Sequence, residues 1–241
     1  MENERKRKLE KNFFKVFLIN ALLNVKMLNI VVSLFYVSRG LRLEEIFYLS
    51  AIFSVTVLFS EVPSSYLADK FGRKQTIIMA GFFGLLYWVF YLIADSFFLF
   101  AIGMIFFALA ESCMSGTDEA FIYDTNKELG NQNDSLRKLS RYLSSERVFK
   151  IFAVILGIFI AKDLAEWQFN LIIIVDIVAS ICAIIFAFTL VEPNHFIDLE
   201  KQEVGLVKDG YKIISQDKRV RAAVFSKILI YTATSITWLY F

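Results

Sequence analysis

Six long apolar runs, separated by short polar or charged connections, dominate the pattern of this chain. They cover residues 13–37, 46–68, 76–94, 97–122, 142–161 and 167–191, and a seventh run covers 222–241. Each has about 20 residues, the length that an α-helix needs to cross the hydrocarbon core of a bilayer. Because lipid offers backbone groups no hydrogen-bonding partner, we expect each run to be a helix. The pattern predicts an all-α polytopic membrane protein.

The distribution of positive charge predicts the orientation of these helices. Most of the 26 Lys and Arg residues lie in alternate connections: the N-terminal arm, residues 69–74, the connection after Ile122 and the segment after the sixth run. The other connections carry only Arg39, Arg42 and Lys162. Since cytoplasmic loops are enriched in Lys and Arg, we expect the N-terminus to be cytoplasmic.

Composition supports a membrane protein and gives no sign of an enzyme. Of the 241 residues, 57% are hydrophobic, and the net charge is only +2. Cys113 and Cys182 both fall within apolar runs, so we predict no disulfide framework. The sequence contains no phosphate-binding glycine loop, metal-ligand cluster or nucleophile with a nearby base. We therefore predict no enzymatic activity, cofactor, metal or nucleic-acid partner.

Two ionisable residues lie near the centres of apolar runs, Lys26 in the first and Glu111 in the fourth. A charge at this depth is unfavourable by at least about 2.5 kcal/mol and marks a transport pathway or an internal pair. Helical spacing places further polar residues on the same two faces, namely Asn29 and Ser33 with Lys26, and Ser115 and Asp118 with Glu111. The alternative is a buried ion pair that only fixes helix packing. Asp176, central in the sixth run, is expected to have a packing or interhelical hydrogen-bond role, and proton binding is the alternative.

The connection between the second and third runs is a short charged turn, Leu67-Ala68-Asp69-Lys70-Phe71-Gly72-Arg73-Lys74. Gly72 can adopt the positive φ that a tight turn needs. Arg73 and Lys74 begin the next helix, and a cation is unfavourable at a helix N-terminus. We therefore expect Arg73 to have a carboxylate partner.

This turn resembles the loop signature of the major facilitator superfamily of secondary transporters, Gly-x-Leu-Ala-Asp-basic-x-Gly-Arg-basic, with Ser65 in place of the first glycine. The resemblance implies that Arg73 pairs with Asp124, at the cytoplasmic end of the fourth helix, in a latch that closes the cytoplasmic side. It also implies that Asp69 faces a helix of a second half that this sequence lacks. The alternative is that Lys70, Arg73 and Lys74 only anchor the turn at the membrane surface.

The family packs its first and fourth helices around a central cavity, so the resemblance permits a direct pair between Lys26 and Glu111. Residues 61–65 and 115–124 resemble a bacterial efflux-type subgroup. Glu61, Asp118 and Glu119 are then candidates for proton binding, because a poorly solvated carboxyl group can exchange a proton. The fifth run has small residues at Ala153, Gly157 and Ala161, a close-packing pattern, where proton-coupled drug exporters of the family have a Gly-Pro motif.

The resemblance implies four parts of the chain. These are a cytoplasmic arm (1–12), the six-helix N-terminal half (13–191), a cytoplasmic linker with a possible amphipathic helix (192–221) and the first helix of a truncated C-terminal half (222–241). Whether the linker is an amphipathic helix or a solvated segment stays open.

The predicted function is secondary transport of a small organic solute by alternating access, as proton-coupled efflux across the bacterial plasma membrane. The predicted partners are the lipid bilayer, the solute, protons and the missing C-terminal half, and the chain as given is expected to be inactive alone. Two alternatives are a half-size transporter that works as a homodimer and a non-transporting membrane protein that binds another helical partner.

Overall fold

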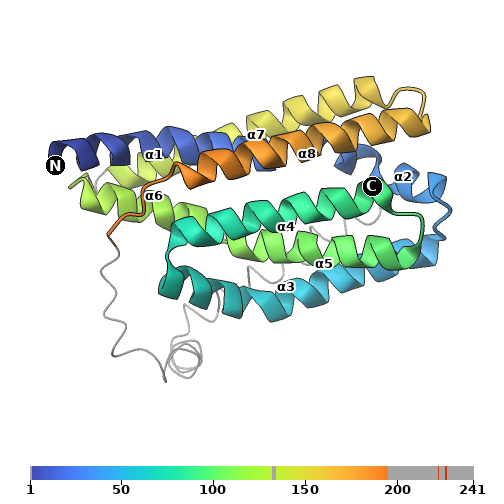
Figure 1. The fold of residues 1–241 in the computed structure, drawn as a ribbon, viewed down its shortest axis with the longest axis horizontal. Helices are drawn as coiled ribbons and strands as arrows, with labels where there is room; N and C mark the ends of the chain where they lie inside the picture. The colour runs from blue at the N-terminus through green and yellow to red at the C-terminus, as the bar shows by residue number, and fades with distance from the viewer. Residues whose placement is uncertain (1, 132–133, 195–221, 223–225, 227–241) are drawn as a thin grey trace. The chain divides into compact units, whose positions relative to one another are not determined.

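A computed structural model describes residues 2–131, 134–194, 222 and 226, and these residues contain helices and no strand (Figure 1). The helical segments are α1 (Glu2–Leu23), η1 (Met27–Val31), α2 (Val32–Ser38), α3 (Leu43–Phe71), α4 (Arg73–Ile93), α5 (Phe97–Met114), α6 (Thr117–Glu128), α7 (Ser135–Ile160) and α8 (Glu166–Phe188). The predicted amphipathic helix of the linker and the predicted helix over 222–241 lie outside the described residues. The all-helical prediction is confirmed.

The helices lie alongside one another in a bundle. Figure 1 shows α3 at one edge and α1, α7 and α8 at the other, with α4 and α5 between them. Accordingly, α4 packs against both α5 and α8, α3 packs against α5, and α1 packs against α8. Segments far apart in the sequence thus meet along their lengths, as expected for helices that share one apolar core.

Among the described residues, five segments are long and apolar enough to cross a membrane: Asn3–Ser38, Leu43–Phe71, Arg73–Ile93, Phe97–Glu128 and Glu166–Phe188. They correspond to the first four predicted runs and the sixth. The fifth predicted run lies in α7, which is helical but carries Arg137, Lys138, Arg141, Arg147 and Lys150 in its first part. Membrane crossing by α7 stays a prediction.

Two of the runs that the sequence predicts as helices are each interrupted within their length, a feature that the sequence pattern did not predict. The first span is interrupted between α1 and η1, where Lys26 has a φ of 29°. There the side-chain amide of Asn24 donates a hydrogen bond to the carbonyl of Asn20 at 2.9 Å, which also accepts the helical bond from the Asn24 N–H at 3.0 Å. The fourth span is interrupted between α5 and α6, where Gly116 has the left-handed conformation, with a φ of 75°.

Two buried clusters hold the bundle together. One is aromatic and brings together Phe35, Tyr91, Phe100 and Phe169, each at most 1% exposed. The other contains Ile19, Ile77 and Phe121, among further aliphatic residues. In contrast, α3 leaves large apolar side chains such as Leu58 and Phe59 exposed, a surface suited to lipid or to further helices.

Candidate functional site

The ammonium of Lys26 donates a hydrogen bond to Oε1 of Glu111 at 2.5 Å, in an ion pair that joins the two broken spans. We call Lys26 and Glu111 the central pair. Lys26 belongs to the break between α1 and η1, and Glu111 lies in the last turn of α5, just before the second break. The side chain of Lys26 is 18% exposed and that of Glu111 is 44% exposed, so the pair is open to a surface of the bundle through Glu111.

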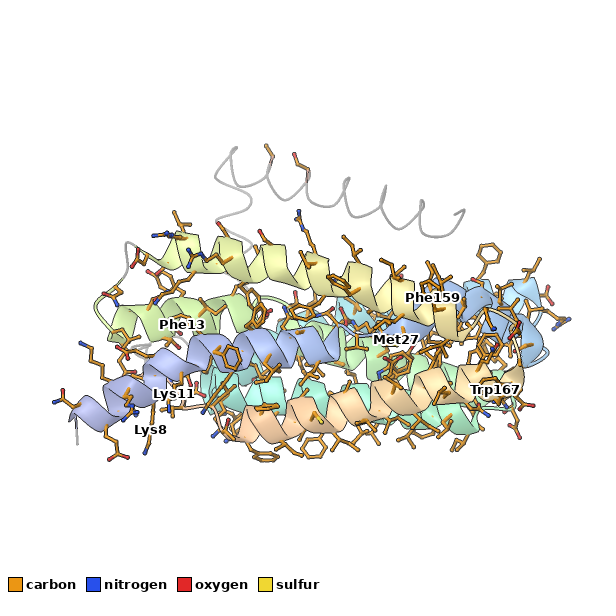
Figure 2. The ribbon with its side chains drawn as sticks, turned by 90° about the horizontal axis from the view of Figure 1, so that it is seen from above. Lys8, Lys11, Phe13, Met27, Phe159 and Trp167 are labelled. Carbon is orange, nitrogen blue, oxygen red and sulfur yellow. The ribbon has the colours of Figure 1, made fainter. Side chains whose placement is uncertain are left out.

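The central pair lies away from both ends of the bundle. Figure 2 shows Met27, the neighbour of Lys26, far from Lys8 and Lys11 and nearer to Phe159, with Trp167 further toward the other end. The ring of Phe107 lies under the ammonium of Lys26, 4.9 Å from Nζ to the ring centroid. An aromatic face attracts a cation where water is scarce. The direct pair that the resemblance permits is present.

A third ionisable residue, Asp176 of α8, lies beside this pair and is 1% exposed. Its Oδ1 accepts a hydrogen bond from the backbone N–H of Met27 at 3.3 Å. The expected interhelical bond is thus present, and it holds the first turn of η1, where a carboxylate is favourable. The other oxygen, Oδ2, is buried without a hydrogen-bond partner among the described residues.

The other predicted pathway residues are distributed over separate segments. The predicted faces assumed regular helical spacing, and this spacing is interrupted at the two breaks. It therefore does not show which of these residues lie on the same face. Asn29 is partly exposed in η1, and Asp118 in the first turn of α6 accepts a hydrogen bond from the Tyr142 hydroxyl at 2.5 Å. The exposed members of the set are Ser33 of α2, Glu61 of α3, Ser115 at the second break and Glu119 of α6. Their place in a pathway stays a prediction.

The charged turn between α3 and α4 contains the predicted ion pair. Nε of Arg73 lies 2.7 Å from Oδ2 of Asp124, and the two side chains are 14% and 11% exposed. Gly72 has a φ of 99°, the positive value expected for this turn. Of the other members, Asp69 is partly exposed in the last turn of α3, and Lys70 donates a hydrogen bond to the Tyr66 hydroxyl at 3.0 Å.

Sequence reasoning missed a second carboxylate at this turn, Glu192, which it placed at the start of the linker. Glu192 accepts hydrogen bonds from the backbone N–H groups of Arg73 at 2.8 Å and Lys74 at 2.7 Å. These N–H groups have no partner within the helix, and an anion is favourable there. The two basic residues that begin α4 were a signal that an anion was needed, but 119 residues separate Arg73 from Glu192.

Residues from α1 and α6 hold the segment that carries Glu192. Asn12 and Val191 exchange two hydrogen bonds, from the Asn12 amide to the Val191 carbonyl at 2.8 Å and from the Val191 N–H to Oδ1 of Asn12 at 3.1 Å. Glu128 accepts hydrogen bonds from Nε of Arg5 and from the backbone N–H of Asn194, both at 2.6 Å. We call this end of the bundle, which carries Arg5, Arg73 and Lys74, the basic end. Residues of α1, α4, α6 and the segment after α8 meet there.

Comparison with known proteins shows what the chain is similar to. The sequence model described as Major Facilitator Superfamily matches residues 16–241. A Bacillus subtilis (strain 168) protein named as an uncharacterized MFS-type transporter, YxaM, is 24% identical over 202 residues, which are 83% of this chain and 50% of that protein. The chain therefore spans about half the length of this relative.

Proposed function

This chain belongs to the Major Facilitator Superfamily, and from that premise we propose that it forms the first half of a proton-coupled transporter that exports a small organic solute by alternating access. Residues 13–191 are the proposed half, 1–12 an arm, 192–221 a linker, and 222–241 the first helix of the second half. We also propose a bacterial plasma-membrane location with a cytoplasmic N-terminus, which rests on the positions of the Lys and Arg residues.

The central pair is the observation that carries this proposal. Nζ of Lys26 lies 2.5 Å from Oε1 of Glu111. The first residue lies at the interruption of the first span, and the second lies just before the interruption of the fourth. In many secondary transporters, interrupted helices form the substrate and ion sites near the middle of the bilayer. Glu111 is 44% exposed, so this carboxylate can meet a solute at the bundle surface, where a second half would complete the cavity. Asn29, Ser33 and Ser115 are the proposed polar neighbours of this pathway, and Glu61, Asp118 and Glu119 are proposed proton sites.

The proposed gate is the turn at the basic end. The ion pair between Arg73 and Asp124 ties α4 to α6 while this side is closed, and Glu192 ties α4 to the exit of α8. Opening toward the cytoplasm would then require the ion pair to separate. Asp69, Lys70, Gly72 and Lys74 complete the proposed gate motif.

A second half is required in this proposal because transport in such folds depends on two repeats that rock around a shared site. The test compares solute flux in liposomes that contain the 241-residue chain with flux in liposomes that contain the chain joined to a second half. A ligand panel read by thermal shift selects the solute. We expect flux only from the joined form. Robust flux from the chain alone would contradict the need for a second half and favour a homodimer of half-size transporters.

The role of the central pair is tested in the joined form by the charge swap Lys26→Glu with Glu111→Lys. We expect transport to be lost even though a pair can still form, because the solute meets the wrong charge. Full transport would show that the pair only fixes helix packing. A matched control is the swap Arg39→Glu with Glu166→Arg, which reverses an ion pair of 3.3 Å between the connection from α2 to α3 and the first residue of α8 and should leave transport unchanged.

A further inference from the structure

Two carboxyl groups near the middle of the bundle, those of Glu111 and Asp176, share the positive charge of Lys26, and Lys150 of α7 also acts on Glu111. Lys26 brings one positive charge, while Glu111 and Asp176 can each bring a negative one. The ammonium of Lys26 is hydrogen-bonded to Glu111 and also attracts Asp176 electrostatically. With both carboxyl groups ionised, the three residues therefore carry a net charge of minus one.

The excess charge falls on the more enclosed carboxyl group. Asp176 is 1% exposed, and its Oδ2 has no hydrogen-bond partner among the described residues. Buried polar atoms are normally paired, and an ionised group without full pairing is unfavourable in an apolar interior. Besides Lys26, the backbone N–H groups of Met27 and Leu28 and the Tyr87 hydroxyl of α4 act on Asp176. Lys150 of α7 acts on Glu111. Because Lys150 acts on Glu111, Oδ2 of Asp176 is the atom of this group where one further positive charge would be favourable.

The side chains around Oδ2 of Asp176 favour a proton there over a metal ion. Hard metal cations take about six or more oxygen ligands. The part of the chain that the structure describes contains no group of three or more His, Cys, Asp or Glu side chains able to hold a metal ion. A proton needs only the one free oxygen.

We propose that Asp176 is an exchangeable proton-binding residue, and that its proton controls which carboxylate Lys26 contacts. This inference rests on the proposed transport function and names its coupling site. When Oδ2 takes a proton from a hydronium ion, an O–H bond of hydronium breaks, an O–H bond forms at Oδ2 and a water molecule leaves. Oδ1 keeps its bond to the Met27 N–H, and Lys26 stays with Glu111. When the proton leaves, the Asp176 carboxylate attracts the ammonium away from Glu111.

The break in the first span allows this exchange. Lys26 is the residue with the positive φ, and Met27, which follows it, is the residue that Asp176 holds. The side chain of Lys26 therefore leaves the backbone at the junction between α1 and η1. The carboxyl group of Glu111 is on α5, and that of Asp176 is on α8. A change of partner moves charge toward or away from Glu111, the exposed member, where a solute is proposed to bind.

Infrared difference spectroscopy of the purified 241-residue chain in nanodiscs tests the proposal, with pH as the variable. We expect a C=O band of a protonated carboxyl group that disappears as pH rises, is lost in Asp176→Asn and is unchanged in the control Asp95→Asn, an exposed aspartate in the connection between α4 and α5. In Glu111→Gln, Lys26 is released toward Asp176, so the band should disappear at a lower pH. A band that Asp176→Asn leaves in place would overturn the proposal.

A second measurement needs no variant and covers the case in which Asp176→Asn does not fold. A membrane-permeant carbodiimide forms adducts with protonated carboxyl groups, and mass spectrometry of the unaltered chain should find the adduct on Asp176, decreasing as pH rises. An adduct confined to Glu111, or thermal stability that follows Na⁺ concentration with no carboxyl band, would overturn the proposal. Neither experiment uses a solute, so a missing band contradicts this inference alone, whereas missing flux contradicts the proposed function.

Discussion

The carboxylate of Glu192 occupies the space that a side chain at Gly72 would need. A Cβ atom at Gly72 would lie 3.0 Å from Cδ of Glu192, closer than carbon atoms normally approach. The φ of 99° at Gly72 is also one that other residues rarely adopt. The glycine therefore shapes the turn and leaves the N–H groups of Arg73 and Lys74 open to the carboxylate.

Gly72→Ala should lower the free energy of unfolding by about 1–3 kcal/mol, because the substitution combines backbone strain with a collision. Denaturant unfolding of the chain in detergent measures this loss. In a Glu192→Ala background the collision is absent, so only the backbone strain should remain and the loss should be smaller. Gly40→Ala is a matched control, since Gly40 has a φ of 83° and nothing within 4 Å of a Cβ. An equal loss for Gly72→Ala in both backgrounds would contradict the contact with Glu192.

Separating Arg73 from Asp124 should destabilise the chain markedly, because both side chains are largely buried. Removing one partner of such a pair leaves a poorly solvated charge, and we expect Asp124→Asn to lower the free energy of unfolding by about 2–4 kcal/mol. A double-mutant cycle with Arg73→Gln should give a coupling energy of about 1–3 kcal/mol.

The matched control for this cycle is Arg42 with Glu44, a pair at the same 2.7 Å whose side chains are 74% and 55% exposed. Such a pair should give a coupling energy below about 1 kcal/mol. If the cycle of Arg73 and Asp124 gives no more than this control, the pair is a surface contact and the proposed latch loses its energetic basis.

The sequence predicted the helices well and their interruptions poorly, for a physical reason. Apolar runs of membrane length must be helical, so Thr76 to Ala94 could be assigned without tertiary information. The breaks at Lys26 and Gly116 lie within runs that remain apolar on average. A single charged residue or glycine is compatible with a continuous helix, and only the surrounding packing decides otherwise.

Contacts between two side chains could be predicted from the sequence, whereas contacts between a side chain and a distant backbone group could not. Arg73 needed a carboxylate because of where it stands in its helix, and the family resemblance supplied Asp124. Lys26 and Glu111 were matched by their depth in two runs. Glu192 and Asp176 bond to backbone N–H groups of distant residues. A backbone donor carries no signal in the side-chain pattern, so neither bond to a particular residue could be predicted.

The closest backbone approach at the first break involves Gly157, and it gives the last prediction. A Cβ atom at Gly157 would lie 2.7 Å from the carbonyl oxygen of Met27, so α7 packs directly on η1. This contact confirms the predicted close packing of α7, in which Ala153 and Ala161 are also buried. Gly157→Ala must push α7 away from the segment that Asp176 holds.

We expect Gly157→Ala to lower the free energy of unfolding by about 1–3 kcal/mol, although alanine favours a helix more than glycine does. Gly84→Ala in α4 is the matched control, because Gly84 is also within a helix and has nothing within 4 Å of a Cβ. That variant should be neutral or more stable by up to about 1 kcal/mol. Denaturant unfolding of both variants in the same detergent makes the comparison. Equal stability changes would mean that α7 can move away from Met27 at no cost. The contact of α7 with η1 would then not be what stabilises the break in the first span.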